Sequence, residues 1–240
     1  MSKPNRIFVK ERLGPGAEVR LADETAHYVR DVMRLKEGAE ILMFNGKDGE
    51  WLCMAEAVSK REFVVRATKQ TRAQSAEKLA QTELIFSPLR HAHQDMLIQK
   101  ATELGVSSLT PALMNHSAVK DFNAERADAI AREAAEQSER LSMPEISALM
   151  PLEKLIKNFD FSKRTLVYLD ERQNAGARNP EEFRHLGASD MALLVGPEGG
   201  FSAAEFALLA GTKAIPITLG RLILRAETAA IAALSLWNLR

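Results

Sequence analysis

The sequence predicts an α/β fold in two parts, a small N-terminal β-barrel followed by a larger α/β domain. The first 70 residues hold short strand-like runs joined by glycine turns, whereas after residue 80 apolar strands alternate with helices. The polar stretch QTRAQSAEKLA separates the two patterns. We therefore predict domains at 1–72 and 81–240, joined by a linker at 73–80. A chain of 240 residues, 46% of them hydrophobic, is long enough to bury a core in each part.

The N-terminal part is predicted to be mostly β with one helix. The segment NGKDG at 45–49 lies between two strand-like runs and is typical of a hairpin turn. The helix begins at Asp23, a candidate cap, and Gly38 lies beyond its end. The expected strands are 6–10, 18–21, 40–45, 50–58 and 62–68.

The C-terminal part is predicted to be a parallel sheet covered by helices on both faces, because its strands are short and apolar. Ser202 and Glu205 form an S-x-x-E capping box at the start of one helix. The expected strands are 82–88, 107–114, 144–149, 165–170, 191–196 and 214–219. The expected helices are 94–105, 123–141, 152–159, one opened by Asn179 and Pro180, 202–211 and 227–238. Ligands bind such sheets at the carboxyl ends of the strands, where Gly196 and Gly220 lie.

Composition narrows the class of protein. The formal net charge is zero, which argues against a generic nucleic-acid binder, although residues 1–72 carry +3 (14 basic, 11 acidic) and the remainder −3. The single cysteine, Cys53, excludes an internal disulfide and a cysteine-based zinc site. The pair His91 and His93 lacks further ligands at metal spacing, so no metal is expected. We see no leader-like segment and no membrane-length apolar run, so we expect a soluble cytoplasmic protein without a membrane partner.

The stretch LLVGPEGGFS at 193–202 is the strongest candidate for a ligand loop. Its glycines allow a ligand to approach the backbone closely. It matches neither nucleotide fingerprint, and Glu198 would repel a phosphate, so a neutral or cationic ligand with a ribose and a base fits better. A tight turn without a ligand is the alternative, but three glycines exceed what a turn needs. Ser202 is a helix cap rather than a nucleophile, because the second glycine of a nucleophile elbow is missing.

A second candidate stretch, LGRLILRAET, follows at 219–228. A helix N-terminus explains Glu227 and Thr228. It does not explain Arg225, whose guanidinium is suited to a phosphate or to a carbonyl oxygen that gains negative charge.

Together these two stretches resemble the C-terminal signatures of the RsmE family, which methylates N3 of a uridine in 16S rRNA and belongs to the SPOUT superfamily. The stretches HYVRDVMRLKEG, IQKATELGV and EQSERLSMPEI also match in kind and order, so the resemblance covers nearly the whole chain. It implies a PUA-like RNA-binding barrel, a SPOUT α/β domain threaded into a trefoil knot, S-adenosylmethionine as cofactor, the small ribosomal subunit as partner, and a homodimer with its site at the subunit interface.

The resemblance also implies roles for individual residues. Arg225 is the candidate for stabilising charge on the uracil oxygens, and Glu198 is either the base or a ligand of the cofactor ribose. The implied cofactor contacts are Leu194, Gly196, Pro197, Glu198, Gly199, Leu219, Gly220, Leu224, Glu227 and Thr228. The predicted RNA contacts are Arg6, Arg30, Arg34, Arg90, His116 and Arg140.

Two positions depart from the family pattern. Many relatives have arginine where this chain has Leu222 and His116, which affects the expected RNA contacts more than the cofactor loops. The general base is not identified by the sequence. Three alternatives remain: a SPOUT methyltransferase for another rRNA or tRNA site, a non-catalytic RNA-binding assembly factor, and an α/β protein that binds another nucleotide. The intact ligand loop and the paired signatures count against the last two.

Overall fold

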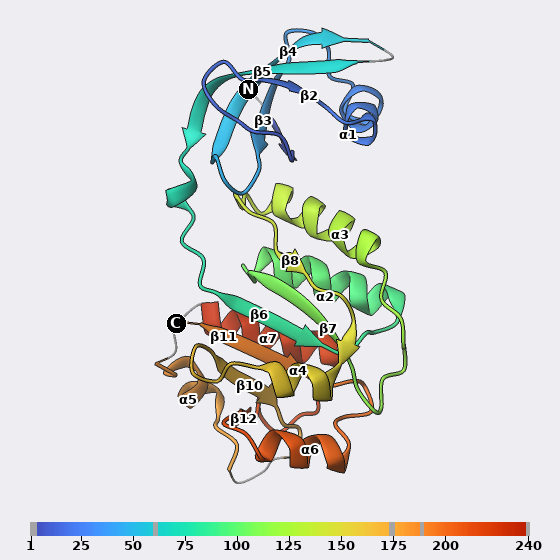
Figure 1. Ribbon diagram of the computed structural model, residues 1–240, viewed down its shortest axis with the longest axis vertical. Helices are drawn as coiled ribbons and strands as arrows, with labels where there is room; N and C mark the ends of the chain where they lie inside the picture. Colours follow the sequence, from blue (N-terminus) through green and yellow to red (C-terminus); the bar gives the residue numbers. More distant parts are fainter. Residues whose placement is uncertain (1–3, 60–61, 173–175, 188–189, 239–240) are drawn as a thin grey trace. The chain divides into compact units, whose positions relative to one another are not determined.

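The computed structural model describes residues 4–59, 62–172, 176–187 and 190–238 (Figure 1). Its contacts divide the chain into two compact units. One comprises Met1–Lys78 together with Ala135–Met143, and the other comprises Leu79–Ala134 together with Pro144–Arg240.

The N-terminal unit is built on a five-stranded sheet with the order β1-β3-β4-β5-β2. The strands are β1 (Asn5–Phe8), β2 (Glu18–Arg20), β3 (Glu40–Phe44), β4 (Glu50–Val58) and β5 (Phe63–Arg72). Only the β1–β3 pair is parallel, and register shifts between β4 and β5 mark the bulges that let a sheet bend. The predicted strands are confirmed, but the described pairs form an open path rather than a closed barrel. Cys53 is buried in the core of this unit.

The predicted first helix is shorter than its sequence pattern. It consists of α1 (Asp23–His27) and a single π turn, η1 (Tyr28–Val32). Arg34 then adopts a φ of 56°, in the left-handed region where an α-helix cannot continue. The predicted side-chain cap by Asp23 lies outside the described side chains. The short helix η2 (Gln74–Ala76) lies in the predicted linker.

A buried arginine organises the interior of this unit. Arg6 is 8% exposed, its Nε donates to Glu50 at 2.5 Å, and its guanidinium lies 4.3 Å from the centre of the Phe44 ring. Glu50 also accepts hydrogen bonds from Arg72 and Thr71, both at 2.9 Å. Burial alone would raise the pKa of the Glu50 carboxyl, but the hydrogen bonds from Arg72, Arg6 and Thr71 outweigh it and hold that pKa below its usual value.

The segment Ala135–Met143 packs with this unit, although it follows much of the other unit in sequence. Arg6 donates to the carbonyl oxygens of Ala135 (3.1 Å), Glu136 (2.9 Å) and Arg140 (2.7 Å). Arg140 is itself only 6% exposed, and burial lowers its pKa to about 10. Arg6 and Arg140 were predicted to contact RNA, but both lie in the interior, where Arg6 supports the fold. We therefore leave both out of the RNA-contact set proposed below.

The C-terminal unit contains a seven-stranded sheet in which every pair is parallel, as predicted. Its order is β12-β10-β11-β6-β7-β8, with β9 also paired to β7. The strands are β6 (Thr82–Phe86), β7 (Ser108–Leu113), β8 (Glu145–Ile146), β9 (Met150–Pro151), β10 (Thr165–Leu169), β11 (Met191–Val195) and β12 (Ile215–Ile217). The predicted strand 144–149 is thus reduced to the short strand β8, and β9 begins just beyond the predicted range; both strands pair with β7.

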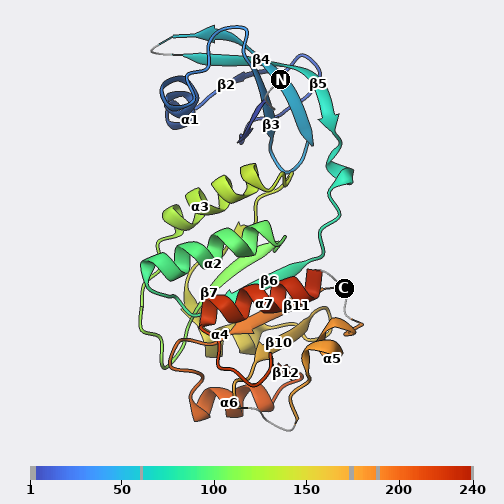
Figure 2. The ribbon, with the colours of Figure 1, turned by 180° about the vertical axis from the view of Figure 1, so that it is seen from behind.

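Helices cover both faces of this sheet. The helices α2 (His91–Glu103) and α7 (Ala226–Asn238) pack together on one face (Figure 2), and α5 (Pro180–Arg184) contacts α7. The helices α4 (Leu152–Asn158) and α6 (Ala203–Ala210) share an apolar core on the other face. The remaining helix, α3 (Ala124–Gln137), ends before the predicted residue 141 because Glu139 has a φ of 61°. Within the described ranges, no helix is long and apolar enough to span a bilayer.

The predicted helix starts at Asn179 and Ser202 are confirmed, whereas α2 begins at His91, three residues before the predicted residue 94. Ser202 Oγ accepts from the backbone N–H of Glu205, whose carboxylate accepts in return from the N–H of Ser202. Asn179 forms the equivalent capping box with Glu182, and Pro180 follows it at the first helical position. These caps fix where α5 and α6 begin, and therefore where the preceding loops end.

Candidate active site

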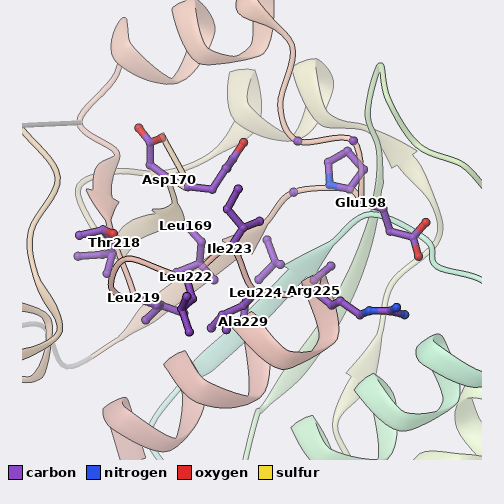
Figure 3. Close-up of a pocket in the computed structure, with 18 of the residues that line it drawn as sticks. Leu169, Asp170, Glu198, Thr218, Leu219, Leu222, Ile223, Leu224, Arg225 and Ala229 are labelled. Atoms are coloured by element: carbon purple, nitrogen blue, oxygen red, sulfur yellow. The ribbon is translucent and has the colours of Figure 1, made fainter. Parts of the chain in front are cut away.

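Three loops at the carboxyl edge of the sheet enclose a cavity of about 680 Å³ (Figure 3). They follow β10, β11 and β12, and they contribute residues 169–171, 195–200, 217–220 and 222–226. Ala229 of α7, with Arg90 and His93 from the start of α2, completes the lining. Gly196 and Gly220, which were expected to mark a ligand-binding edge, both line this cavity.

The glycine loop can adopt its shape only with small residues. Gly200 has a φ of 70°, and a Cβ added there would lie 2.6 Å from Oε1 of Glu171. A Cβ on Gly199 would lie 3.0 Å from the Cβ of His116. The loop turns tightly because the N–H of Gly200 donates to the carbonyl of Pro197 at 2.9 Å. The glycines thus allow both the tight turn of the loop and the close approach of neighbouring groups to its backbone.

The loop after β7 supports the glycine loop and the start of α6 through hydrogen bonds. Nδ1 of His116 lies 3.0 Å from the carbonyl oxygen of Gly200 and 3.2 Å from that of Gly199. Carbonyl oxygens only accept, so Nδ1 carries the proton. Asn115 donates from its side chain to Ser202 Oγ and from its backbone to the buried Glu205, both at 2.8 Å. His116, one of the two departures from the family pattern, therefore supports the ligand loop.

The loop after β10 was not assigned any role from the sequence. Asp170 is 2% exposed, and Arg172 holds it with two hydrogen bonds of 2.9 and 2.7 Å. The guanidinium of Arg172 lies 3.2 Å from the centre of the Phe206 ring, and its hydrogen bond to Asp170 raises its pKa. Glu171 is exposed and lines the cavity beside Gly200. The sequence signal that could have identified this loop is the acidic pair Asp170 and Glu171, which directly follows a buried strand of the parallel sheet.

Apolar side chains gather on one side of the cavity, where Asp170 and Thr218 also lie, and the other side is charged. Figure 3 shows Leu219 and Leu222 on one side, whereas the side chains of Glu198 and Arg225 extend on the other. Leu222 and Ile223 are each 81% exposed, an unusual state for large apolar side chains that lack a ligand or partner. The arrangement suits a ligand with one flat apolar part and one polar part.

Of the predicted cofactor contacts, seven line the cavity: Gly196, Pro197, Glu198, Gly199, Leu219, Gly220 and Leu224. Arg225, the predicted catalytic residue, lines it as well. Leu194 is fully buried in β11, Glu227 is 5% exposed and contacts His93, and Thr228 is exposed on α7. None of these last three is part of the described lining.

The remaining predicted RNA contacts are on the surface. Arg30 is bound to Asp31 at 2.8 Å and to the carbonyl of Ser59 at 3.0 Å. Arg34 is exposed, and Arg90 is exposed at the cavity. No three His, Cys, Asp or Glu side chains in the described part of the chain gather closely enough to hold a metal ion.

Comparison with known protein families identifies two matching models. Residues 75–238 match a model described as an RNA methyltransferase domain. Residues 21–68 match one described as an RNA methyltransferase PUA domain. Curated relatives named "Ribosomal RNA small subunit methyltransferase E" include that of Rickettsia conorii, 33% identical over 97% of this chain and 94% of the relative. The protein of the same name from Bacillus subtilis is 30% identical over 96% of this chain and 94% of the relative.

Two solved structures resemble the whole chain. A putative methyltransferase from Legionella pneumophila, in complex with SAM, has a TM-score of 0.85 and 28% identity and covers 98% of this chain and 97% of its own. The ribosomal RNA small subunit methyltransferase E from Neisseria gonorrhoeae, bound to S-adenosyl methionine, also has a TM-score of 0.85, with 25% identity over 97% and 96%.

Proposed function

Because this chain belongs to the RsmE family of ribosomal RNA small subunit methyltransferases, we propose that it methylates N3 of a specific uridine in 16S rRNA, with S-adenosylmethionine as the methyl donor. The observation that carries the proposal is the cavity at the sheet edge, where the GPEGG loop meets the ILRAET stretch. The proposed RNA contacts are Arg30, Arg34, Arg90 and His116. A ribosomal substrate would place the reaction in the cytoplasm.

The lining of the cavity fits this methyl donor. Leu219, Leu222 and Leu224 offer apolar surface for an adenine, and the glycine loop borders the cavity beside them. The carboxylates of Glu171 and Glu198 suit a donor that carries positive charge, because neither makes an ion pair among the described residues. Asp170 is already held by Arg172 and shapes the wall instead. When bound, the donor supplies an electrophilic methyl group on a sulfonium.

The chain's own residues then act on the uracil. The weakly acidic proton on N3 must be removed, and the negative charge that results spreads over O2 and O4. Arg225 is exposed on the charged side of the cavity and carries a permanent positive charge, so we assign it the stabilisation of that oxygen charge.

We also propose the architecture that family membership implies. The N-terminal unit would be a PUA-like RNA-binding domain, and the C-terminal unit a SPOUT domain with a trefoil knot. The active form would be a homodimer. The exposed apolar side chains of Leu222 and Ile223 at the cavity mouth fit a surface that a bound cofactor or a second subunit covers.

The direct test uses purified protein, labelled S-adenosylmethionine and small subunits that lack the modification. We expect label on one uridine of 16S rRNA, with the methyl group at N3 by mass spectrometry of the isolated nucleoside. Fully modified subunits are the control and should accept no label. Label on another RNA would contradict the substrate, and an absence of transfer to any RNA would contradict the activity.

Gly200→Ala should weaken binding of S-adenosylmethionine about tenfold. A left-handed φ costs a residue with a Cβ about 1–2 kcal/mol, and the new Cβ also displaces Glu171. Isothermal titration calorimetry measures the change. Gly187→Ala is the matched control, because a Cβ there meets nothing within 4 Å. Equal affinities in the two variants would show that the loop shape does not govern binding.

His116→Ala should weaken the same binding about three- to tenfold, because the carbonyls of Gly199 and Gly200 lose their shared donor. His116→Arg restores N–H donors at this position and should recover most of the affinity. Calorimetry with both variants distinguishes a bracing role from a simple steric one, in which the arginine variant would bind no better than the alanine variant.

A further inference from the structure

His93 connects the cavity to a buried carboxylate. It lies in the first turn of α2 and lines the cavity, and its side chain is 34% exposed. Its Nδ1 lies 2.9 Å from Oε1 of Glu227 in the first turn of α7, 134 positions along the chain. The function proposed above assigns no role to the partly exposed ring of His93 or to its buried partner Glu227.

Glu227 is placed so that its charge acts on this imidazole. The residue is 5% exposed, and its Oε2 accepts no hydrogen bond from any residue that the structure describes. A buried carboxylate is costly unless a donor compensates it, and His93 is the partner in the described part of the chain. Because an ionised carboxylate only accepts, the proton sits on Nδ1 of the neutral ring. That tautomer leaves the lone pair of Nε2 available as a base.

We propose that His93 is the general base that removes the N3 proton of the uridine, and that Glu227 is its positioning residue. The proposal rests on the function proposed above and supplies the base that the sequence did not identify. Glu227 fixes the tautomer and stabilises the imidazolium once it forms, as a carboxylate does behind a catalytic histidine.

The proton and electron balance is complete with the groups named. The N3–H bond breaks, its proton passes to Nε2 of His93, and its electron pair stays on N3 with charge shared by O2 and O4. An N3–CH₃ bond forms as the S–CH₃ bond of the donor breaks, and that electron pair stays on sulfur. The imidazolium then releases its proton to solvent, which reaches the partly exposed ring.

Several charged groups share the cavity with this imidazole. Arg90 immediately precedes α2 and Arg225 lies in the loop before α7, and both oppose protonation of the ring. Glu227 from α7 favours protonation. The carboxylates of the loops after β10 and β11 line the same cavity and also favour it: Asp170, Glu171 and Glu198. The uracil anion thus forms between His93, which Glu227 orients, and the guanidinium of Arg225, which stabilises the charge on the uracil oxygens.

The alternative is that the pair only ties α2 to α7, which pack against each other in any case. A purely structural tie would affect stability and cofactor binding, but it would give the reaction no dependence on the protonation of His93. The two roles therefore differ in what they predict for rate, affinity and pH.

The experiment compares His93→Gln, Glu227→Gln and the control His91→Gln, an exposed histidine that does not line the cavity. We expect single-turnover methyl transfer to fall about 100-fold or more in His93→Gln and about tenfold in Glu227→Gln. Affinity for S-adenosylmethionine by calorimetry and the thermal midpoint should stay near those of the wild type. The wild-type rate should fall as the pH is lowered through the histidine range, and His93→Gln should lack that fall.

A second arm covers the case in which the glutamine variant folds poorly. His93→Ala assayed with added imidazole should regain part of the lost rate, and the control variant should not respond. A rate within about threefold of the wild type in His93→Gln, or a loss matched by lost cofactor affinity, overturns the proposal. A flat wild-type pH profile across the histidine range also overturns it. Failure of the wild type itself to label N3 would instead overturn the proposed function.

Discussion

Replacing Arg225 with glutamine is expected to reduce methyl transfer about 100- to 1,000-fold while S-adenosylmethionine binds within about threefold of the wild-type affinity. The reason is that the guanidinium meets negative charge only when the N3 proton leaves and charge develops on O2 and O4. The donor already carries positive charge, so removing a cation does not weaken its ground-state binding. An interaction made only in the transition state affects the rate rather than the affinity.

The measurement pairs single-turnover rates with calorimetry. Arg221→Gln is the matched control, because Arg221 is exposed in the same loop but does not line the cavity. The loss in Arg225→Gln should be independent of pH, because an arginine stays protonated throughout the accessible range. This pH independence distinguishes Arg225 from His93, whose replacement should remove the fall of the methyl-transfer rate at low pH. An equal fall in rate and in donor affinity would show that Arg225 binds the donor rather than the developing charge.

Local chemistry made much of the cavity predictable. The caps at Asn179 and Ser202 are readable because their partners lie within three residues. The glycine loop after β11 was predictable because a buried strand, a turn and a capped helix follow one another directly. The carboxyl edge of a parallel sheet then predicted where the cavity lies.

Long-range partners could not be read from local patterns. The sheet order places β12 beside β10, not beside β11, and no strand pattern specifies its neighbour. That order brings Asp170 and Glu171 to the cavity. His93 and Glu227 likewise meet only because α2 and α7 cover the same face.

Arg6 is a second case in which the sequence did not reveal the long-range partners of a residue. Arg6 lies in the N-terminal segment 1–72, which carries a net charge of +3, and it was predicted to contact RNA. Its acceptors lie 44 residues away at Glu50 and about 130 residues away at Ala135 and Glu136. A charged side chain is buried only when such partners exist, and the sequence does not reveal them.

Arg6→Ala should therefore destabilise the N-terminal unit by about 3–5 kcal/mol, the cost of removing one partner from a buried ion pair. Glu50 would keep Arg72 and Thr71, but the carbonyls of Ala135 and Glu136 would lose their buried donor. Denaturant unfolding monitored by fluorescence can follow each unit separately. Trp51 reports the N-terminal unit and Trp237 the C-terminal unit, and these are the two tryptophans of the chain.

Arg66→Ala is the matched control, because Arg66 pairs with Glu56 and Glu18 at the exposed surface of the same unit and should change stability far less than Arg6→Ala does. Acid unfolding provides a second measurement. The lowered pKa of Glu50 contributes stability that is present above its unfolded-state value and is lost as the pH falls through the folded-state value. Without Arg6, Glu50 loses one of the hydrogen bonds that lower its pKa, while burial still raises it. The pKa of Glu50 therefore rises, and the unfolding transition reported by Trp51 should begin at a higher pH. A transition at the wild-type pH, with unchanged denaturant stability, would mean that Arg6 is not needed to hold Ala135–Met143 in the unit.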